Sequence, residues 1–283
     1  MTTALDVSAF APWIGRTEES EDLVTPHAVR GMRAIFDDDA PVKEGDALPP
    51  AWHWMFNNPV APQSRLGRDG HPKRGGFVPP IELPRRMWTG SEVTFEAPIR
   101  VGDRIRRLSR IESLTPKSGS TGTLVFLMVR HEVTSSSGGR TVDLQRIVYR
   151  EDPAPGAPQP KAEPAKHAAE FSMRMEPDPV MLFRFSALTF NGHRIHYDRV
   201  YATQVEGYPG LVVHGPLIAT LLLDLLHRNE PHAEVAAFSF KALRPTFDLH
   251  PFAVHGRREG AGVRLWAQDH EGWLTMDAQA TLR

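Results

Sequence analysis

The stretch LIATLLLDLL, residues 217–226, limits the fold of this chain more than any other feature. It is apolar on nearly every face of a helix, and only Asp224 interrupts it. Such a helix has to be buried on most sides. A curved antiparallel sheet wrapped around one helix meets this requirement, and the run is too short to cross a bilayer. We therefore expect a helix over 214–228 that is enclosed by a sheet.

The chain divides into two halves with the same coarse order of elements. Residues 151–170 are rich in proline and alanine without an apolar period, which predicts a semi-rigid linker. The N-terminal unit would span 1–150 and the C-terminal unit 171–283. The first unit has its own helix candidate at 26–37, where Thr25 suits the N-cap and a proline follows.

Each helix candidate precedes a series of strand-like runs that are rich in β-branched and aromatic residues. A long polar stretch, 38–80, separates the first helix from its strands. The expected strands are 91–99, 103–114, 122–134 and 140–150 in the first half, and 234–247, 251–258, 262–270 and 272–282 in the second. This order predicts the α+β class, as a duplicated unit.

Composition excludes several classes of function. The chain has no cysteine, so it has neither disulfides nor thiolate ligands nor a cysteine nucleophile. Its formal net charge of −1 gives no overall attraction to nucleic acid or to an anionic membrane. The N-terminus lacks the basic and apolar regions of a signal peptide, so we expect a cytoplasmic protein.

The stretch RFSALTFNGHRIHYD, residues 184–198, gathers polar groups behind an apolar run. We expect a strand at 181–185, a turn at Asn191, and a short helix over 196–204. His196 would then lie at the start of that helix, where the positive end of the helix dipole disfavours a protonated imidazole. A neutral histidine of this kind can act as a general base.

A second signal is YPGLVVHGPLIATLLL, residues 208–223. Gly215 followed by proline marks the start of a helix with a bare backbone. The N–H groups in its first turn lack helical acceptors and could stabilise a developing oxyanion.

Together these residues resemble a known family. FSALTFNGHRIHYD and VVHGPLIATLL are similar to the motif and the central helix of MaoC-like hydratases and dehydratases, which have the hotdog fold. GSEVTFEAPIRVGD and IVYRE in the first half resemble the branch of hydroxyacyl-thioester dehydratase type 2 and mesaconyl-C4-CoA hydratase. The resemblance implies a double hotdog, with one curved antiparallel sheet and one central helix per unit.

The resemblance also implies the activity. It is the reversible hydration of a 2-enoyl-CoA thioester, with a short branched dicarboxylic acyl group such as mesaconyl-C4-CoA. No metal or redox cofactor is implied, because coenzyme A enters as part of the substrate. The C-terminal unit would carry the chemistry, and the N-terminal unit would shape the acyl or coenzyme A site.

Site residues are carried over position by position. His196 falls on the catalytic histidine of the family, and Gly215 falls on the oxyanion donor. Asn191 stands where better-known members have an aspartate, and an amide cannot take up a proton. The resemblance puts His193 and Arg194 at motif positions beside the substrate. His214 could contact the substrate as well, or it could pack in the turn before the helix.

Other interpretations of these residues stay open. His196 could be a helix-cap histidine without a chemical role. His193, His196, Asp198 and His214 could bind zinc, but no HExxH motif or cysteine set accompanies them, so we expect no metal. Asp198 would cap the 196–204 helix.

Three groups outside the motif are also open to two interpretations. The basic loop RLGRDGHPKRGG, 65–76, is expected to be solvated surface, although Arg65, Arg68, Lys73 and Arg74 could contact coenzyme A phosphates. The aromatics of 52–56 could line an acyl pocket or belong to the core. Arg184 or Arg244 could pair with a substrate carboxylate or lie on the surface.

Two other functions remain alternatives. A hotdog thioesterase would direct water at the thioester carbonyl carbon instead of the β-carbon. The asparagine at 191 also fits a non-catalytic acyl-CoA-binding subunit. A homodimer is compatible with each of these functions.

Overall fold

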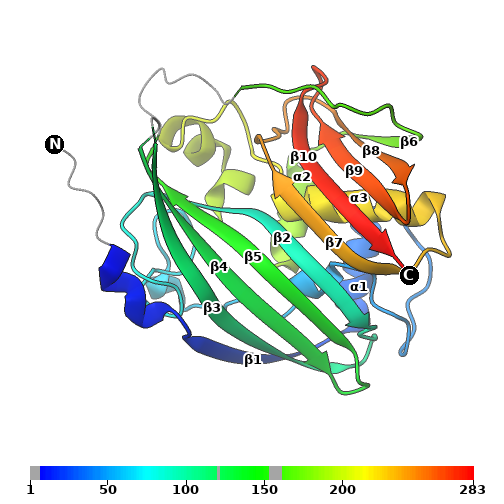
Figure 1. The fold of residues 1–283 in the computed structure, drawn as a ribbon, viewed down its shortest axis with the longest axis horizontal. Helices are drawn as coiled ribbons and strands as arrows, with labels where there is room; N and C mark the ends of the chain where they lie inside the picture. The colour runs from blue at the N-terminus through cyan, green and yellow to red at the C-terminus, as the bar shows by residue number, and fades with distance from the viewer. Residues whose placement is uncertain (1–6, 120–121, 153–160) are drawn as a thin grey trace.

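One antiparallel sheet of ten strands organises the described part of the chain (Figure 1). The computed structural model describes residues 7–119, 122–152 and 161–283. The strands of the first half are β1 (Thr17–Leu23), β2 (Arg85–Ala97), β3 (Arg104–Gly119), β4 (Gly122–Ser135) and β5 (Arg140–Arg150). Those of the second half are β6 (Phe171–Met175), β7 (Val235–Ala242), β8 (Phe252–Glu259), β9 (Gly262–Gln268) and β10 (Leu274–Leu282).

The strand order repeats between the halves. The first half reads β1-β3-β4-β5-β2 from its edge inward, and the second reads β6-β8-β9-β10-β7. The two halves join where β2 pairs antiparallel with β7, in a register that sets Ser91 opposite Phe240. This arrangement is the expected double hotdog, and its repeated order confirms the duplication.

The β2–β7 junction requires a glycine at position 90. A Cβ atom added to Gly90 would lie 2.4 Å from the carbonyl oxygen of Phe240, which is a backbone atom and cannot swing away. The absence of a side chain therefore allows the two halves to pair closely.

Helix α3 (Gly215–Asn229) is buried as its apolar sequence requires. It passes behind β7, β10 and β9 in Figure 1, and it contacts β8 and β9 most extensively. Leu217 and Leu222 are fully buried in the main core. Within the described ranges, no helix combines the length and apolar character needed to cross a membrane.

Helix α1 (Pro26–Ile35) also forms where it was expected. The side chain of Thr25 accepts a hydrogen bond from the Ala28 N–H at 3.2 Å, so it is the N-cap. Val29, Met32 and Ile35 are buried at helical spacing, and α1 packs against α2.

The strand expected at 181–185 is wrong, because this segment belongs to α2 (Pro179–Leu188). Asp178 caps the helix by accepting hydrogen bonds from two N–H groups, and a proline follows at the first helical position. Leu182, Phe185 and Ser186 are buried at offsets of three and four, which is a helical period.

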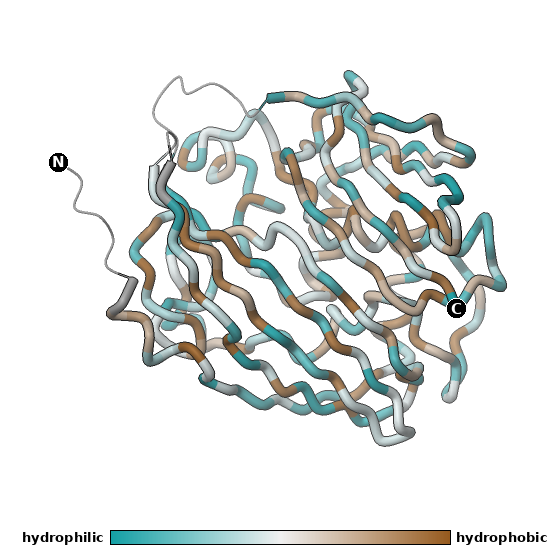
Figure 2. Tube along the Cα trace, in the orientation of Figure 1, coloured by the Kyte–Doolittle hydropathy of each residue, from teal (hydrophilic) through white to brown (hydrophobic). Residues whose placement is uncertain are grey.

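Strands β1 and β6 were not expected. β1 reads TEESEDL and is exposed at nearly every position, so it has no apolar alternation to identify it. It is an edge strand and pairs only with β3, whereas the inner strands alternate between apolar and polar residues (Figure 2).

Two segments outside the sheet are the long stretch after α1 and the expected linker. Residues 36–84 contain two short 3₁₀ turns, Trp52–Met55 and Gln63–Arg65. Part of the expected linker, 153–160, lies outside the described residues. The linker and the unit boundaries at 150 and 171 therefore stay a prediction.

Candidate active site

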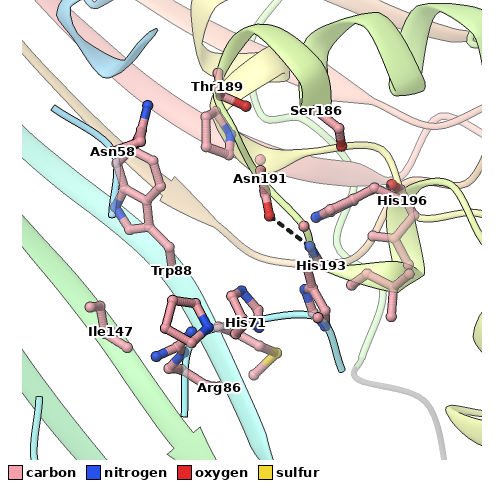
Figure 3. A pocket seen from close by; sticks show the side chains of 18 of the residues that line it. Asn58, His71, Arg86, Trp88, Ile147, Ser186, Thr189, Asn191, His193 and His196 are labelled. Atoms are coloured by element: carbon pink, nitrogen blue, oxygen red, sulfur yellow. Dashed lines mark hydrogen bonds between the residues drawn. The ribbon is translucent and has the colours of Figure 1, made fainter. Parts of the chain in front are cut away.

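A cavity of about 2550 Å³ is lined by both halves of the chain. The first turn of α3 and the segment that follows α2 form one wall, and β2, β4 and β5 contribute to the other. Figure 3 shows the close-up, in which Trp88 and Ile147 face the histidines of the motif. The cavity is therefore a joint product of the two units.

His196 is buried and lines this cavity. Its Nδ1–H donates to the carbonyl oxygen of Val212 at 2.7 Å, which leaves Nε2 without a proton. Figure 3 shows the side chain directed toward Asn191. The ring is thus held with its basic nitrogen available on the cavity side.

Burial is what keeps His196 neutral. It lowers the pKa of His196 to about 4, although the hydrogen bond to Val212 acts in the opposite direction. The expected cause, a helix beginning at 196, is wrong: His196 ends a 3₁₀ turn, Arg194–His196, and the next helical turn is Tyr201–Val205. The predicted neutral state therefore has a different physical origin.

His214 packs against the ring of His196. The two imidazole rings stack with their centroids 3.7 Å apart. His214 is fully buried and its Nε2 is hydrogen-bonded to Ser186 Oγ at 2.8 Å. Burial also lowers the pKa of His214 well below its ordinary value. His214 therefore presents a neutral face that fixes the plane of His196, and it is not among the residues that line the cavity.

Gly215 is the first residue of α3 and lines the same cavity as His196. The first N–H that the helix itself uses is that of Ile218, which donates to His214 O at 3.1 Å. The N–H groups of Gly215 and Leu217 therefore precede the helical hydrogen-bond pattern. A Cβ atom at Gly215 would have no neighbour nearer than 4.0 Å, so its backbone borders open space.

Asn191 is placed by the end of α2. Its N–H donates to Ser186 O at 2.8 Å, and Phe190 before it has a positive φ of 47°. The Asn191 Oδ1 accepts from the His193 N–H at 3.0 Å, as in an Asx turn. This bond uses one lone pair of the oxygen, and the side-chain NH₂ group adds donors to the cavity lining.

Arg194 does not reach the cavity lining. Its guanidinium donates to Asp198 Oδ2 at 2.7 Å and lies 4.2 Å from the Tyr201 ring centroid. Asp198 also accepts from the Tyr201 N–H, as expected of a cap. The structure thus gives Arg194 a structural position in place of the expected one beside the substrate.

The basic loop 65–76 is partly buried against the motif, so its interpretation as solvated surface is wrong for its centre. Arg194 N–H donates to Asp69 O at 2.9 Å, and His71 lines the cavity. Arg74 is occupied by the carbonyl oxygens of Ile81, Leu83 and Pro84. Arg65 and Lys73 are exposed beside the cavity, so a contact with coenzyme A phosphates stays a prediction for them.

The carboxylate of Asp69 lies beside His71 and His193 at the site. Their rings lie 4.2 Å apart, and His71 Nδ1 is hydrogen-bonded to Asp69 Oδ2 at 2.9 Å. Burial lowers the pKa of His193 far below its ordinary value, with His71 and His196 as further causes. Within the described residues, Asp69, His71 and His193 are the one group with potential metal ligands inside 4.8 Å.

This group differs from the zinc set considered from the sequence, because His196, Asp198 and His214 do not belong to it. Asp69 and His71 are also committed to each other by their hydrogen bond. The expectation of no metal stays a prediction.

The remaining candidates divide between cavity and surface. Of the aromatic stretch 52–56, His53 and Trp54 line the cavity, and the others are core. Arg244 lines the cavity, whereas Arg184 is exposed on α2 and away from it.

Sequence reasoning missed Asp69, His71 and Arg86. Asp69 and His71 belong to a DGH turn, which was a signal for them. The turn was overlooked because the loop 65–76 was interpreted only by its positive charge. Arg86 lies on β2, outside the strand limits that were expected, and Figure 3 shows it beside His71.

Comparisons with known proteins agree with this geometry. A family model for hydroxyacyl-thioester dehydratase type 2 matches residues 51–248. The chain is 45% identical over 272 residues to the mesaconyl-C(4)-CoA hydratase of Chloroflexus aurantiacus, which covers 95% of this chain and 96% of that protein. It is 28% identical to the mitochondrial hydroxyacyl-thioester dehydratase type 2 of Schizosaccharomyces pombe, over 74% of this chain and 77% of that protein.

A solved structure supports the fold. The MaoC-like dehydratase from Phytophthora capsici superposes with a TM-score of 0.71 over 99% of each chain, at 11% identity. At this identity the likeness speaks for the fold alone.

Proposed function

The chain belongs to the hydroxyacyl-thioester dehydratase type 2 family, and we propose that it catalyses the reversible addition of water to a 2-enoyl-CoA thioester. The observation that carries this proposal is that His196 and the start of α3 at Gly215 line one cavity. His196 supplies a neutral base, and the start of α3 supplies backbone N–H donors.

The chemistry follows from these two groups. The thioester oxygen faces the N–H groups at Gly215, which stabilise the charge that develops there as water adds to C3. The Nε2 atom of His196 takes one proton from the attacking water and delivers it to C2. A C3–O bond and a C2–H bond form, and His196 returns to its neutral state.

Asn191 holds the water or the thioester through its amide N–H. It cannot accept the proton, since its oxygen is an amide oxygen that is already bound to the His193 N–H. His196 is therefore the acid–base group of the motif. The step moves only water and a proton, so it needs no metal or redox cofactor.

We propose a short branched dicarboxylic substrate of the mesaconyl-C4-CoA type. A relative that is 45% identical carries that activity in its name. Arg86 and Arg244 line the cavity and supply the positive charge that a free carboxylate would require.

Incubating the purified protein with a panel of enoyl-CoAs, including mesaconyl-C4-CoA, tests the proposal. Loss of enoyl absorbance without release of free thiol is the expected result. Release of thiol would instead identify a thioesterase. Binding without turnover of any enoyl-CoA would identify an acyl-CoA-binding subunit.

A further inference from the structure

The centre of the 65–76 loop is fastened to the motif by its backbone. Gly70 has a φ of +89°, and a Cβ atom there would lie 1.9 Å from the carbonyl oxygen of Gly192. Arg194 N–H donates to Asp69 O at 2.9 Å, and the Arg194 guanidinium donates to Arg68 O at 3.2 Å. The position of His71 therefore depends on Gly192 and Arg194, which precede His196 in the motif.

Asp69 determines which nitrogen of His71 can accept a proton. Asp69 Oδ2 is a carboxylate oxygen that only accepts, so Nδ1 of His71 donates to it and Nε2 bears no proton. The His71 N–H also donates to Asp69 Oδ1 at 3.1 Å, which fixes the turn. The side chain of His71 lines the cavity and is 23% exposed.

His71 is neutral in this setting. Burial lowers its pKa, and Arg74 and Arg86 lower it further, whereas Asp69 acts in the opposite direction. The neighbouring ring of His193 is neutral for the same reason, since burial is the main cause of its lowered pKa. His71 can therefore accept a hydrogen bond at neutral pH.

A water that attacks C3 through a lone pair is oriented best when both of its O–H groups meet acceptors. His196 Nε2 is the first of these. The Asn191 oxygen already accepts from the His193 N–H, which uses one of its two lone pairs, and its nitrogen only donates. His71 offers the cavity a further acceptor from outside the motif.

We propose that His71, held in this tautomer by Asp69, is a catalytic residue whose Nε2 accepts the second O–H of the attacking water. The inference rests on the proposed hydratase function and deepens it. His196 takes the first proton and passes it to C2, the second O–H remains as the product hydroxyl, and His71 stays neutral. Asp69 is a positioning residue that acts through His71.

The test compares His71→Phe with His71→Gln in the full-length protein on mesaconyl-C4-CoA. Phenylalanine keeps a ring against His193 but has no acceptor, so we expect kcat to fall by about 10- to 100-fold with KM within a factor of two. Glutamine has an acceptor oxygen at a similar reach and should restore part of the lost kcat. The exposed His232→Gln is the matched control, with circular dichroism to verify folding.

Asp69 is tested by a double-mutant cycle. Asp69→Asn should lower kcat on its own and cause no further loss in the His71→Phe background, because both changes remove one function. A purely structural role would make the two losses additive. Additive losses would overturn the role of Asp69.

The remaining outcomes are also decisive. Unchanged kcat in a folded His71→Phe variant of an active parent would overturn this inference and leave the hydratase function standing. An inactive parent would overturn both. Inhibition by a chelator that zinc reverses would replace the water-acceptor role of His71 with a metal site at Asp69, His71 and His193.

Discussion

At the scale of single residues, the site depends on histidines that burial keeps neutral. The pKa of His196 is lowered to about 4 mainly by burial, and its stacking on His214 fixes the plane of the ring. The proton on Nδ1 is held by Val212 O, so the basic nitrogen is directed by a backbone contact. The protein thus obtains a base that is ready at neutral pH.

The first prediction concerns His196→Gln. The variant keeps a polar side chain of similar size but has no imidazole, so kcat should fall by about 10²- to 10⁴-fold. The rate of enoyl-CoA hydration measures the effect, with His232→Gln as the control. Turnover within a factor of two of the parent would remove His196 from the acid–base role.

Part of the site could be predicted at this scale. His196, Asn191 and Gly215 follow one another in short motifs, so their local pattern identifies them. His71 comes from a loop more than a hundred residues earlier, and the backbone contact of Gly70 with Gly192 that places it is not visible in any local pattern. Arg194 carries charge in the motif, yet its partner Asp198 turns it away from the cavity.

At the scale of elements, the end of one helix and the beginning of another form the site. Helix α2 ends at Leu188 and directs Asn191 into the cavity, and α3 begins at Gly215 with its N–H groups on the same side. The strands and helices with strong periodicity were predictable. Helix α2 was not recognised because apolar residues are spread evenly over it, so 181–185 was predicted as a strand.

The start of α3 gives the second prediction. In Gly215→Ala the added methyl group meets no atom nearer than 4.0 Å, so the fold should tolerate it. The methyl group would occupy the space where the thioester approaches the backbone, so kcat/KM should fall at least tenfold. Unchanged thermal stability with unchanged kcat/KM would contradict the oxyanion role.

The third prediction concerns the cap of α2. Asp178 accepts hydrogen bonds from Val180 N–H and Met181 N–H, so Asp178→Ala should lower the free energy of unfolding by about 1 kcal/mol. Asp178→Asn is the matched control, because asparagine caps a helix about as well. Urea unfolding of both variants measures the difference, and equal losses would show that the charge matters more than the cap.

At the scale of the whole molecule, the two units share one sheet and most of one core. Pairing of β2 with β7 makes the sheet continuous, and the main core contains residues from both halves. The duplication could be predicted from element order, but the edge strands were missed. β1 has no apolar alternation, and β6 alternates but is only five residues long.

The fourth prediction is that stability falls as the pH drops below 6.5. Burial lowers the pKa of His131 and His196 to about 4, and that of His214 lies well below 6.5. Between pH 6.5 and 4 the unfolded chain binds these protons and the folded chain does not. Each such histidine should therefore cost roughly 1.4 kcal/mol per pH unit of acidification in that range.

Urea unfolding between pH 7.5 and 5 measures this dependence. His131→Gln removes one of the titrations, so its stability should decline less steeply with acidification than that of the parent. A free energy of unfolding that is constant from pH 7 to 5 would show that these histidines are protonated in the folded state as well.

The junction of β2 with β7 has a consequence for how this protein can change over time. Two separate copies related by symmetry would have to accept every substitution twice, once in each copy. When both units belong to one chain, a substitution in one half leaves the sequence of the other half unchanged. In this chain the reactive motif lies in the C-terminal half, and a loop of the N-terminal half reaches it through Asp69 and Gly70.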